Sequence, residues 1–311
     1  MPKRPIVVVG SSNTDMIIKL ERIPKPGETI LGGEFVSAAG GKGANQAVAA
    51  ARAGGRVAFI ARVGRDMFGE QAIRGFVKDR VAVDFVFQDQ HSPSGVALIF
   101  VAKDGENSIA VASGANTRLS PADIRKSARA FEGAGFLLIQ LETPLETVRA
   151  AADLAARKSV RVLLNPAPAR PLPDALLKKV FIITPNETEA EILTGIRVNG
   201  ESGAARAAAA LRGRGVATVI VTLGARGAYV SGLEFEGIIP GFKVKAVDAT
   251  AAGDVFNGAL AVALSEGRAL AESVRFANAA AAISVTRMGA QPSAPKRKEI
   301  FGFLISQATM A

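Results

Sequence analysis

Short, almost wholly apolar runs alternate along this chain with alanine-rich stretches of helical length, and this alternation constrains the fold more than any other feature of the sequence. Runs such as IVVV at 6–9 and FLLI at 136–139 contain no polar residue, which is typical of strands buried on both faces of a sheet. Helices are expected between such runs, at 44–52, 68–78, 121–131, 144–157 and 201–212. The pattern predicts a single α/β domain over residues 1–311, with a central, mostly parallel sheet and helices on both of its faces.

Two segments break the alternation and are expected to form β-hairpins. Their strands should lie at 16–20 with 29–37, and at 95–101 with 107–112. Together the two hairpins, within about 14–37 and 95–112, would form a small antiparallel sheet outside the main one. Because such a sheet is apolar on one face, that face must cover a ligand or its copy in a second subunit.

The residue types that the chain lacks narrow its chemistry. There is no cysteine, which excludes a disulfide framework, a thiolate nucleophile and a thiolate-ligated metal site, and the expected compartment is a reducing cytoplasm. His91 is the only histidine and lies in an expected loop, so we expect no histidine-based triad. No apolar run approaches the roughly 20 residues that a membrane span needs, so we expect no membrane association.

The formal net charge of +10 favours anionic partners, which include nucleic acid and phosphorylated small molecules. Lysine and arginine are scattered along the chain, however, and aromatic residues make up only 5% of it. The stripe of basic and aromatic residues that is typical of a nucleic-acid surface is therefore absent. We expect a solvated basic surface and no nucleic-acid partner, and a non-enzymatic nucleic-acid binder is the rival interpretation.

A glycine-rich segment, AAGGKGANQA, stands directly before an expected helix. Gly40, Gly41 and Gly43 surround Lys42 there, and glycines let a backbone come close to a ligand with its N–H groups exposed. The segment is not a Walker A loop, because no Ser or Thr follows the lysine, and it is not GxGxxG, because Gln46 occupies the place of the third glycine. Both a ligand-binding loop and a plain strand-to-helix turn fit these residues.

Polar side chains follow two of the expected buried strands. Asn13 and Asp15 come after the strand at 6–9 and offer donors and acceptors suited to the hydroxyl groups of a sugar or polyol. Asn186 and Glu189 are one helical turn apart, so that both can lean toward a hydrated magnesium ion or a phosphate group. The same residues would also suit an ordinary turn and an ordinary helix N-terminus.

The segment VIVTLGARG places a hydroxyl group and two glycines in a turn between two expected strands. Thr222, Gly224 and Gly227, with Arg226 between the glycines, can form a backbone nest for nucleotide phosphates. A plain glycine-rich hairpin would use the same residues.

The most specific segment is DATAAGDVFNG, in which Asp254 follows three small residues where a helix is expected to begin. The first N–H groups of a helix have no intrahelical partner, and the small side chains of Ala251, Ala252 and Gly253 leave room for a phosphoryl group to approach them. Asp254 then stands beside this anion site, where it can take a proton from an attacking hydroxyl group. Alternatively, Asp254 is a first-turn acid that the helix dipole favours.

Taken in order, GSSNTD, GGKGANQA, NETE, TLGARG and DATAAGDVFNG resemble the ribokinase family of carbohydrate kinases, and the resemblance runs from Gly10 to Pro295. It implies an α/β fold with a β-sheet lid and the phosphorylation of D-ribose at its 5-hydroxyl by ATP with Mg²⁺. It also implies a bound potassium ion and a homodimer in which the lids of two subunits pack together. A kinase of the same family for deoxyribose, another sugar or a nucleoside is the alternative.

The resemblance also implies roles for individual residues. Asp254 falls on the position of the catalytic base, and Ala251, Ala252 and Gly253 fall on the anion hole. The implied sugar contacts are Asn13, Asp15, Gly41, Lys42, Gly43, Asn45, Glu142 and Asp254. The implied nucleotide contacts are Asn186, Thr222, Gly224, Arg226, Gly227, Gly253 and Asn278. Potassium is implied to be bound, mostly through backbone carbonyls, by Asp248, Thr250, Ser284, Arg287, Gly289 and Ser293, and magnesium through water by Glu189.

Three positions depart from the family pattern. Asn278 stands where ribokinases often carry a histidine beside the adenine, which leaves the base selectivity open. Ala249 and Ala251 replace the threonine and the glycine of the usual DTTGAGD pattern. Because an alanine N–H can still donate to an oxyanion, we expect the anion hole to survive.

Overall fold

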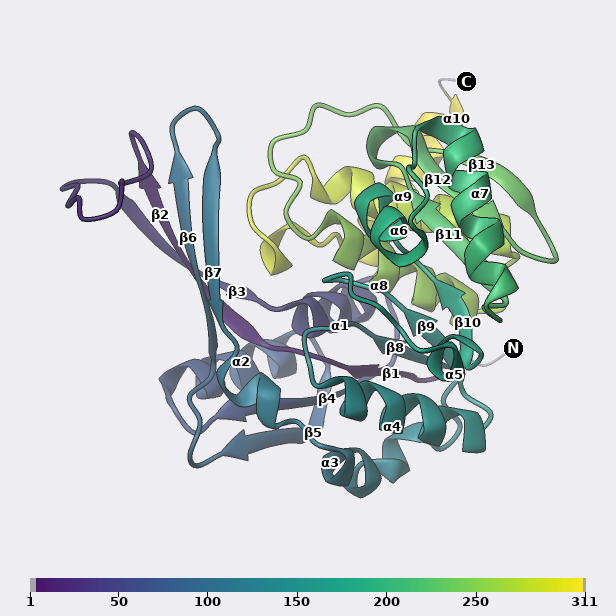
Figure 1. The fold of residues 1–311 in the computed structure, drawn as a ribbon, viewed down its shortest axis with the longest axis horizontal. Helices are drawn as coiled ribbons and strands as arrows, with labels where there is room; N and C mark the ends of the chain where they lie inside the picture. The colour runs from purple at the N-terminus through teal and green to yellow at the C-terminus, as the bar shows by residue number, and fades with distance from the viewer. Residues whose placement is uncertain (1–3, 310–311) are drawn as a thin grey trace.

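The computed structural model describes residues 4–309, and a nine-stranded sheet runs through its body (Figure 1). Its strands lie side by side in the order β13-β12-β11-β10-β9-β8-β1-β4-β5. From β11 to β5 every neighbouring pair is parallel, whereas β11 with β12 and β12 with β13 pair antiparallel. The bounds are β1 Ile6–Val9, β4 Val57–Gly64, β5 Ala82–Asp89, β8 Phe136–Ile139, β9 Arg161–Leu164, β10 Val180–Ile183, β11 Thr218–Thr222, β12 Gly227–Ser231 and β13 Glu236–Pro240. The expected mostly parallel sheet is confirmed.

The two edge strands, β5 and β13, were not expected from the sequence. An edge strand has a neighbour on one side only, so its residues need not be buried throughout. In β5 the exposed Asp84 and Gln88 interrupt half-buried apolar positions, and β13 contains Gly237 and Pro240. Neither strand therefore shows the continuous apolar run by which the inner strands are recognised.

Helices cover both faces of the sheet, and the two faces form two separate apolar cores. Within β1, Ile6 and Val8 pack into one core, and Val7 and Val9 pack into the other, as the pleat of a doubly covered strand requires. The first core includes residues of α1 Lys42–Arg52, α2 Met67–Lys78, α8 Ala252–Ser265, α9 Leu270–Ser284 and α10 Arg297–Thr309. The second includes residues of α3 Pro121–Lys126, α4 Leu145–Arg157, α5 Asp174–Leu177, α6 Glu187–Thr194 and α7 Gly200–Gly213. None of the helices described in residues 4–309 is long and apolar enough to cross a membrane.

Most of the expected helices lie within two residues of their expected bounds, and one is divided. The stretch expected as a helix over 121–131 forms α3, which ends at Lys126, and the 3₁₀ helix η2 at Ala128–Phe131. The hydroxyl group of Ser127 donates to the carbonyl oxygen of Asp123 at 2.8 Å, a local bond that competes with continuation of the helix. The other 3₁₀ helices are η1 Gly114–Arg118, η3 Gly224–Arg226 and η4 Gln291–Ser293.

A separate four-stranded sheet stands out from one end of the body (Figure 1). Its order is β3-β2-β6-β7, with β2 at Asn13–Leu20, β3 at Glu34–Gly40, β6 at Gly95–Ala102 and β7 at Asn107–Ala112. Both expected hairpins are present, although residues 29–33 are not part of a strand. The expectation of a fully antiparallel sheet is wrong, because the central strands β2 and β6 pair in parallel.

The parallel pairing follows from the way the small sheet is connected to the large one. The parallel strands β1 and β5 each lead, at their C-terminal ends, into a strand of the small sheet, namely β2 and β6. These two strands therefore leave the body in the same direction. Their hairpin partners β3 and β7 return to it, and β3 leads directly into α1.

A partly buried ion-pair network ties β4 to the end of β5 and to α3. The guanidinium group of Arg62 on β4 donates to Asp89 Oδ2 at 3.0 Å and to both carboxylate oxygens of Asp123 at 2.8 and 2.9 Å. Asp123 is only 2% exposed, and it also accepts hydrogen bonds from Ser120 in the capping box of α3. Burial would raise the pKa of Asp123, but the hydrogen bonds from Arg62 and Ser120 outweigh it and lower this pKa.

We predict that Asp123→Asn lowers the free energy of unfolding by about 2–4 kcal/mol at neutral pH, because it removes the carboxylate that accepts from Arg62 Nη2 through both oxygens and leaves Asp89 as the only acid paired with this guanidinium in the network. A carboxylate whose pKa is lowered on folding stabilises the protein above its unfolded pKa of about 4, and this contribution is lost as the pH falls through the folded value. The difference between the variant and the wild type should therefore narrow below about pH 4 in urea unfolding curves. The matched control is Asp84→Asn, at an exposed position of β5, which should change stability by less than about 0.5 kcal/mol. Equal stability of Asp123→Asn and Asp84→Asn would contradict this role of the network.

Candidate active site

Most of the predicted sugar and phosphate residues lie where parallel strands of the main sheet end. Glu142 follows β8, Asn186 follows β10, and Thr222 ends β11, while Asn13 begins β2 shortly after β1. Since the carboxyl ends of parallel strands meet at one edge of a sheet, these segments come together there. The backbone confirms one such junction directly, because Asn186 and Thr222 form a parallel bridge.

The glycine-rich turn packs closely against the end of β1. Gly41 has φ 87°, in the left-handed region, and a Cβ atom on Gly43 would lie 2.6 Å from the backbone of Gly10. Only glycines therefore allow this approach of two backbone segments. The helix α1 begins at Lys42, two residues earlier than expected, and the backbone N–H of Lys42 donates to Glu142 Oε2 at 3.0 Å. The turn thus places Lys42 next to Glu142, and both were predicted to contact the sugar.

Four carboxylates interact with Lys42 in this region. Burial alone would lower the pKa of Lys42, but the charges of Asp254, Glu142, Glu189 and Asp15 outweigh it and raise this pKa. Lys42 therefore carries its positive charge at neutral pH. The structure brings together residues that sequence analysis assigned separately to sugar, metal and catalysis.

The carboxyl group of Asp15 has a strongly raised pKa. Burial first, and then the charges of Glu142 and Asp254, raise the pKa of Asp15 to about 6, while Lys42 acts in the opposite direction. Its carboxylate lies over Gly40 on the neighbouring strand β3, where a Cβ atom would be 2.2 Å from Asp15 Oδ2. Gly40 thereby provides the space that this side chain occupies.

Asp254, on the first turn of α8, is well shielded from solvent in spite of the small residues before it. It is 6% exposed, and its two carboxylate oxygens each accept a hydrogen bond from an amide of α1. Asn45 Nδ2 donates to Oδ2 at 3.0 Å, and Gln46 Nε2 donates to Oδ1 at 2.9 Å. Burial raises the pKa of Asp254, and this effect outweighs the lowering by Lys42, Gln46 and Asn45. The shielding comes from α1, which follows the glycine-rich turn, and not from the chain next to Asp254.

The start of α8 is open to an approaching ligand. Ala251 caps the helix in the left-handed conformation, with φ 59° and ψ 12°, and no side chain caps it by a hydrogen bond. Gly253 is exposed, and no atom beyond its own neighbourhood lies within 4 Å of the position where its Cβ would be. The N–H of Ala252 donates to the carbonyl oxygen of Ala249 at 3.2 Å. The N–H groups that follow it in the first turn of an uncapped helix are suited to bind an anion. The alanine that replaces the usual family glycine thus adopts a conformation that normally favours glycine.

Sequence analysis gave no role to a buried set of polar side chains behind Asp254. Gln46 accepts from Gln140 Nε2 at 2.5 Å and donates to Asn165 Oδ1 at 2.9 Å. Thr184 Oγ1 donates to Asn257 Oδ1 at 2.6 Å, and Asn257 Nδ2 donates to the carbonyl oxygen of Gly253 at 2.7 Å. Gln140, Asn165 and Thr184 each directly follow an apolar strand, and this position was the sign in the sequence that could have pointed to them. Ordinary turn residues occupy the same kind of position, so the sequence alone does not distinguish the two.

Asn13, another of the predicted sugar contacts, is also held by a residue to which sequence analysis gave no role. Asn13 Oδ1 accepts from Asn116 Nδ2 at 2.7 Å, and Asn116 Oδ1 accepts from the backbone N–H of Ser12 at 2.8 Å. Asn116 lies in η1, directly after the small sheet returns to the body. Both side chains are buried, so this pair ties the start of β2 to the segment that follows β7.

The segment at Asn186 and Glu189 forms a complete helix cap. Asn186 Oδ1 accepts from the N–H of Glu189 at 2.8 Å, and Glu189 Oε2 accepts from the N–H of Asn186 at 2.9 Å. Only one oxygen of Glu189 takes part in this capping box, so Oε1 is free of it. Burial raises the pKa of Glu189, against the lowering by Asn186 and Lys42. The segment can therefore form an ordinary helix N-terminus and still offer a carboxylate oxygen to a hydrated magnesium ion or a phosphate group.

The predicted nucleotide loop forms a tight turn beside that cap. Gly224 and Gly227 have φ values of 58° and 98°, so the turn needs glycines, and the N–H of Thr222 donates to the carbonyl oxygen of Pro185 at 2.9 Å. Arg226 forms an ion pair with Glu187 on the exposed side. Asn278 on α9 donates through Nδ2 to the carbonyl oxygens of Ile239 and Pro240, both at 3.1 Å. Since Pro240 pairs with Gly227, Asn278 lies close to the nucleotide loop.

Four of the predicted potassium residues lie on two loops that contact each other, whereas Ser284 ends α9 and Ser293 ends η4. Asp248 accepts from the N–H groups of Thr250 and Gly289, each at 2.8 Å, and the N–H of Asp248 donates to the carbonyl oxygen of Val285 at 3.1 Å. Burial would raise the pKa of Asp248, but these hydrogen bonds outweigh it and lower this pKa, so the group stays ionised. Ser284 Oγ donates to the carbonyl oxygen of Ala281 on α9, and Ser293 Oγ donates to that of Ala290, directly before η4. Arg287 pairs with Glu299, so these three side chains have other partners.

Within residues 4–309, no group of three or more His, Cys, Asp or Glu side chains is arranged to hold a metal ion. A cation at the junction of these loops would therefore be bound by backbone carbonyl oxygens beside the single carboxylate of Asp248. That donor set is hard and carries little charge, as a monovalent cation requires. The potassium ion at this junction stays a prediction.

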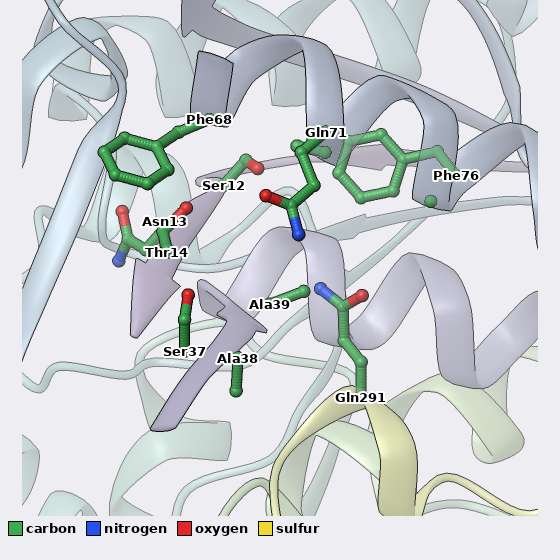
Figure 2. Close-up of a pocket in the computed structure, with 12 residues that line it drawn as sticks. Ser12, Asn13, Thr14, Ser37, Ala38, Ala39, Phe68, Gln71, Phe76 and Gln291 are labelled. Carbon is green, nitrogen blue, oxygen red and sulfur yellow. The ribbon is translucent and has the colours of Figure 1, made fainter. Parts of the chain in front are cut away.

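Figure 2 shows a separate small cavity of about 40 Å³ between the base of the small sheet and α2. Thr14 and Ser37 line it from the sheet, and Gln71 on α2 faces Gln291 across it. Neither Asp15, Lys42 nor Glu142 contributes to the lining. Asn13, a predicted sugar contact, does line it, so the cavity adjoins the predicted sugar residues without including the charged ones around Lys42.

Comparison with known proteins places these features in a family. Residues 3–297 match the pfkB family of carbohydrate kinases. The chain belongs to this family, and it is a carbohydrate kinase.

Particular relatives resemble the chain over nearly its whole length. A ribokinase of Haemophilus influenzae is 48% identical over 302 residues, which cover 97% of this chain and 99% of that protein. The structure of an Arabidopsis thaliana ribokinase complexed with ribose and ATP has a TM-score of 0.88 and 36% identity, and the match covers 97% of this chain and 98% of the other. A deoxyribokinase of Salmonella typhi is 38% identical over 300 residues, which cover 96% and 98% of the two chains.

Proposed function

We propose that the protein transfers the γ-phosphoryl group of ATP to the 5-hydroxyl of D-ribose, giving ribose 5-phosphate and ADP. The observation that carries this proposal is the placement of Asp254, a buried carboxylate, beside the uncapped and open start of α8. The strong similarity to ribokinases over nearly the whole chain supports ribose as the sugar.

In the proposed reaction, Asp254 takes the proton from the 5-hydroxyl as its oxygen attacks the γ-phosphorus. A new O–P bond forms, the bond between the γ-phosphorus and the oxygen of ADP breaks, and ADP leaves. The N–H groups at the start of α8, at Ala251, Ala252 and Gly253, stabilise the negative charge on the transferring group. Because burial raises the pKa of Asp254, its carboxylate is a stronger base than an exposed one would be.

The sugar contacts would come from the residues around Lys42. Asn13, Asp15 and Glu142 offer amide and carboxylate groups, and the glycine-rich turn with Lys42 offers N–H groups and an ammonium. Gly41, Gly43 and Asn45 complete this set. Ionised carboxylates accept hydrogen bonds from sugar hydroxyl groups, which orients the 5-hydroxyl toward Asp254.

ATP would bind between the start of α8 and the loop that follows β11. Thr222, Gly224 and Gly227 provide a turn with exposed backbone, and Arg226 lies at its surface. Asn186 lies next to Thr222 and is placed to approach the phosphates. Asn278 would lie beside the adenine of ATP, and its Nδ2 already donates to two carbonyl oxygens.

Two cations would assist the reaction. Magnesium, reached through water by Glu189, would neutralise phosphate charge when it is bound. Potassium would bind at the loops that carry Asp248, Thr250, Ser284, Arg287, Gly289 and Ser293, mostly through backbone carbonyls. The ionised Asp248 beside those loops supports a cation there.

The whole of 1–311 would act as one kinase domain, of which residues 1–3 and 310–311 lie outside the described part. The small sheet would form its lid over the sugar, because Asp15 lies on β2 within it. Closure of a lid excludes water and so limits wasteful hydrolysis of ATP. The absence of cysteine agrees with a cytoplasmic setting for this reaction.

The lid sheet would also form the contact of a homodimer. Leu98 is 47% exposed and Phe35 is 62% exposed, and the register places them on one face of the sheet. Ile109 and Val111 are 57% and 54% exposed and lie on the other face, which carries Asp15. A sugar beneath the lid cannot cover both faces, so an apolar surface is left for a second subunit.

A kinase for deoxyribose is the second candidate, because a deoxyribokinase is 38% identical to this chain. The two sugars differ by one hydroxyl group. A site that hydrogen-bonds this group would strongly reject the sugar that lacks it.

We predict that, among ribose, 2-deoxyribose, fructose and adenosine, ribose gives the highest kcat/KM when ADP release is measured with ATP. The matched control is Asp254→Asn, which preserves the shape of the side chain and should lower kcat by about 10² to 10⁴ with a modest change in ATP binding. A higher kcat/KM for 2-deoxyribose would favour the alternative. Near-normal turnover of Asp254→Asn would contradict its role as base.

We predict that activity is lost when a chelator removes divalent cations and returns with magnesium. Turnover should also be faster in potassium than in sodium buffers at equal ionic strength, because the proposed site at Asp248 would bind the cation mostly through backbone carbonyls, which suits the larger, less strongly hydrated ion. Equal initial rates in the two buffers would argue against a potassium site.

We predict a dimer of about twice the chain mass of 32.1 kDa in sedimentation equilibrium. A double variant with one lysine on each face of the lid, Leu98→Lys with Val111→Lys, should sediment as a monomer, because burying lysine in an apolar contact is unfavourable. Exposed Ile192→Lys, on α6 of the body, is the matched control and should leave the dimer intact. A wild type that sediments as a monomer would exclude the lid contact.

A further inference from the structure

Gln46 lies behind the candidate base and has no solvent-exposed surface of its own. It follows Asn45 on α1, and its Nε2 donates both to Asp254 Oδ1 and to Asn165 Oδ1, each at 2.9 Å. Its Oε1 accepts from Gln140 Nε2 at 2.5 Å. All three polar partners are buried as well, at 6, 6 and 1% exposure for Asp254, Asn165 and Gln140. Gln46 therefore contacts the base and has no open side toward a substrate.

The direction of these hydrogen bonds is fixed by the chemistry of the partners. A carboxylate such as Asp254 can only accept, and Asn165 presents its Oδ1 to Gln46 while its Nδ2 points to the carbonyl oxygen of Thr184 at 3.4 Å. If the amide of Gln46 were turned around, its oxygen would face two acceptors. The amide therefore has one favourable orientation, and Gln140 completes it by donating to the oxygen that remains.

We propose that Gln46 is the positioning residue of the base: it holds Asp254 Oδ1 in one place, so that the carboxylate is correctly oriented before the sugar binds. This role rests on the proposed function of Asp254. Gln140 and Asn165 act on Asp254 through Gln46, because their side chains hydrogen-bond its amide. They directly follow β8 and β9, which belong to the main sheet.

The second oxygen of Asp254 is held differently. Asn45 Nδ2 donates to Oδ2 at 3.0 Å, and Asn45 is also among the residues proposed to contact the sugar. Asn45 Oδ1 is buried without a hydrogen-bond partner among the described residues, which leaves it an acceptor for a substrate hydroxyl. The bond from Asn45 can therefore change as the sugar binds, whereas the bond from Gln46 stays the same throughout the reaction.

Charged groups around Asp254 influence it as well. Lys42 favours its ionised form, and Glu142 disfavours it. Asp254 in turn raises the pKa of Asp15 and of Glu189. The hydrogen bond from Gln46 is a separate contribution that favours the ionised carboxylate, so its removal should shift the acid limb of the rate profile to higher pH.

The test is the kinetics of Gln46→Met, which keeps the length of the side chain and removes the hydrogen bonds. We expect kcat at neutral pH to fall by about 10- to 100-fold, as for the loss of a hydrogen bond to a charged group. KM for ribose and ATP should change by less than about threefold, because Gln46 touches neither, and an interaction that serves the transition state alone appears in kcat. The acid limb of kcat should move to higher pH. Wild-type kcat in a folded Gln46→Met variant would overturn the proposal.

Two controls separate positioning from a merely structural role. Thr147 on α4 is fully buried, and its Oγ1 donates to the carbonyl oxygen of Leu119 at 2.6 Å. Thr147→Val removes this hydrogen bond and should lower the melting temperature but not kcat. On the background of Asp254→Asn, Gln46→Met should lower kcat by less than about threefold, because the group that it positions is already disabled. A loss of 10-fold or more on that background would show that Gln46 acts elsewhere.

If Gln46→Met does not fold, Gln46→Glu preserves the volume of the side chain and places a second carboxyl group against Asp254. It should reduce kcat at least as far, and wild-type kcat in that variant would equally overturn the proposal. The outcomes also separate this proposal from the proposed function. An inactive wild type, or an active Asp254→Asn, refutes the function of Asp254. An active wild type with an inactive Asp254→Asn and a fully active Gln46→Met refutes the role of Gln46 alone.

Discussion

The burial of one carboxylate, that of Asp254, is the constraint on which the rest of the site depends. A charged group taken out of water is costly unless hydrogen bonds and opposite charges compensate it. Here two amides of α1 donate to its oxygens, and the ammonium of Lys42 favours the ionised form. The same arrangement leaves the start of α8 free of any side-chain cap. The proposed base and the proposed anion site thus lie next to each other because α1 and α8 pack together.

The close packing of α1 depends in turn on glycines. Gly43 lies so near Gly10 that a Cβ atom on either would clash with the backbone of the other. This contact brings the N-terminal turn of α1 to the carboxyl ends of the parallel strands, where Glu142, Asn165 and Thr184 follow β8, β9 and β10. The small sheet grows from the same edge, through the direct connections from β1 to β2 and from β5 to β6. The fold therefore places the proposed lid, sugar site and catalytic groups at one end of the main sheet.

The sequence was informative where a physical requirement leaves a local pattern. Doubly buried strands must be apolar throughout, so most of the inner strands and the flanking helices could be predicted within a few residues. The edge strands β5 and β13 could not, because partial exposure removes that pattern. The parallel pairing of β2 with β6 depends on the order of strands in the main sheet, which no local segment encodes. The residues behind Asp254 were missed for a similar reason. Gln46, Gln140 and Asn165 come from three distant segments, and only the fold brings their amides together.

The central claim of this account is that Asp254 activates the 5-hydroxyl of ribose while the start of α8 receives the phosphoryl group. The most direct test is a crystal structure with ribose and a non-hydrolysable ATP analogue. The account predicts the 5-oxygen of the sugar within about 2.6–3.2 Å of a carboxylate oxygen of Asp254, with the terminal phosphate of the analogue at the start of α8, formed by Ala251, Ala252 and Gly253. A complex in which the lid is closed, but another hydroxyl faces Asp254 or the phosphate lies away from α8, would contradict it.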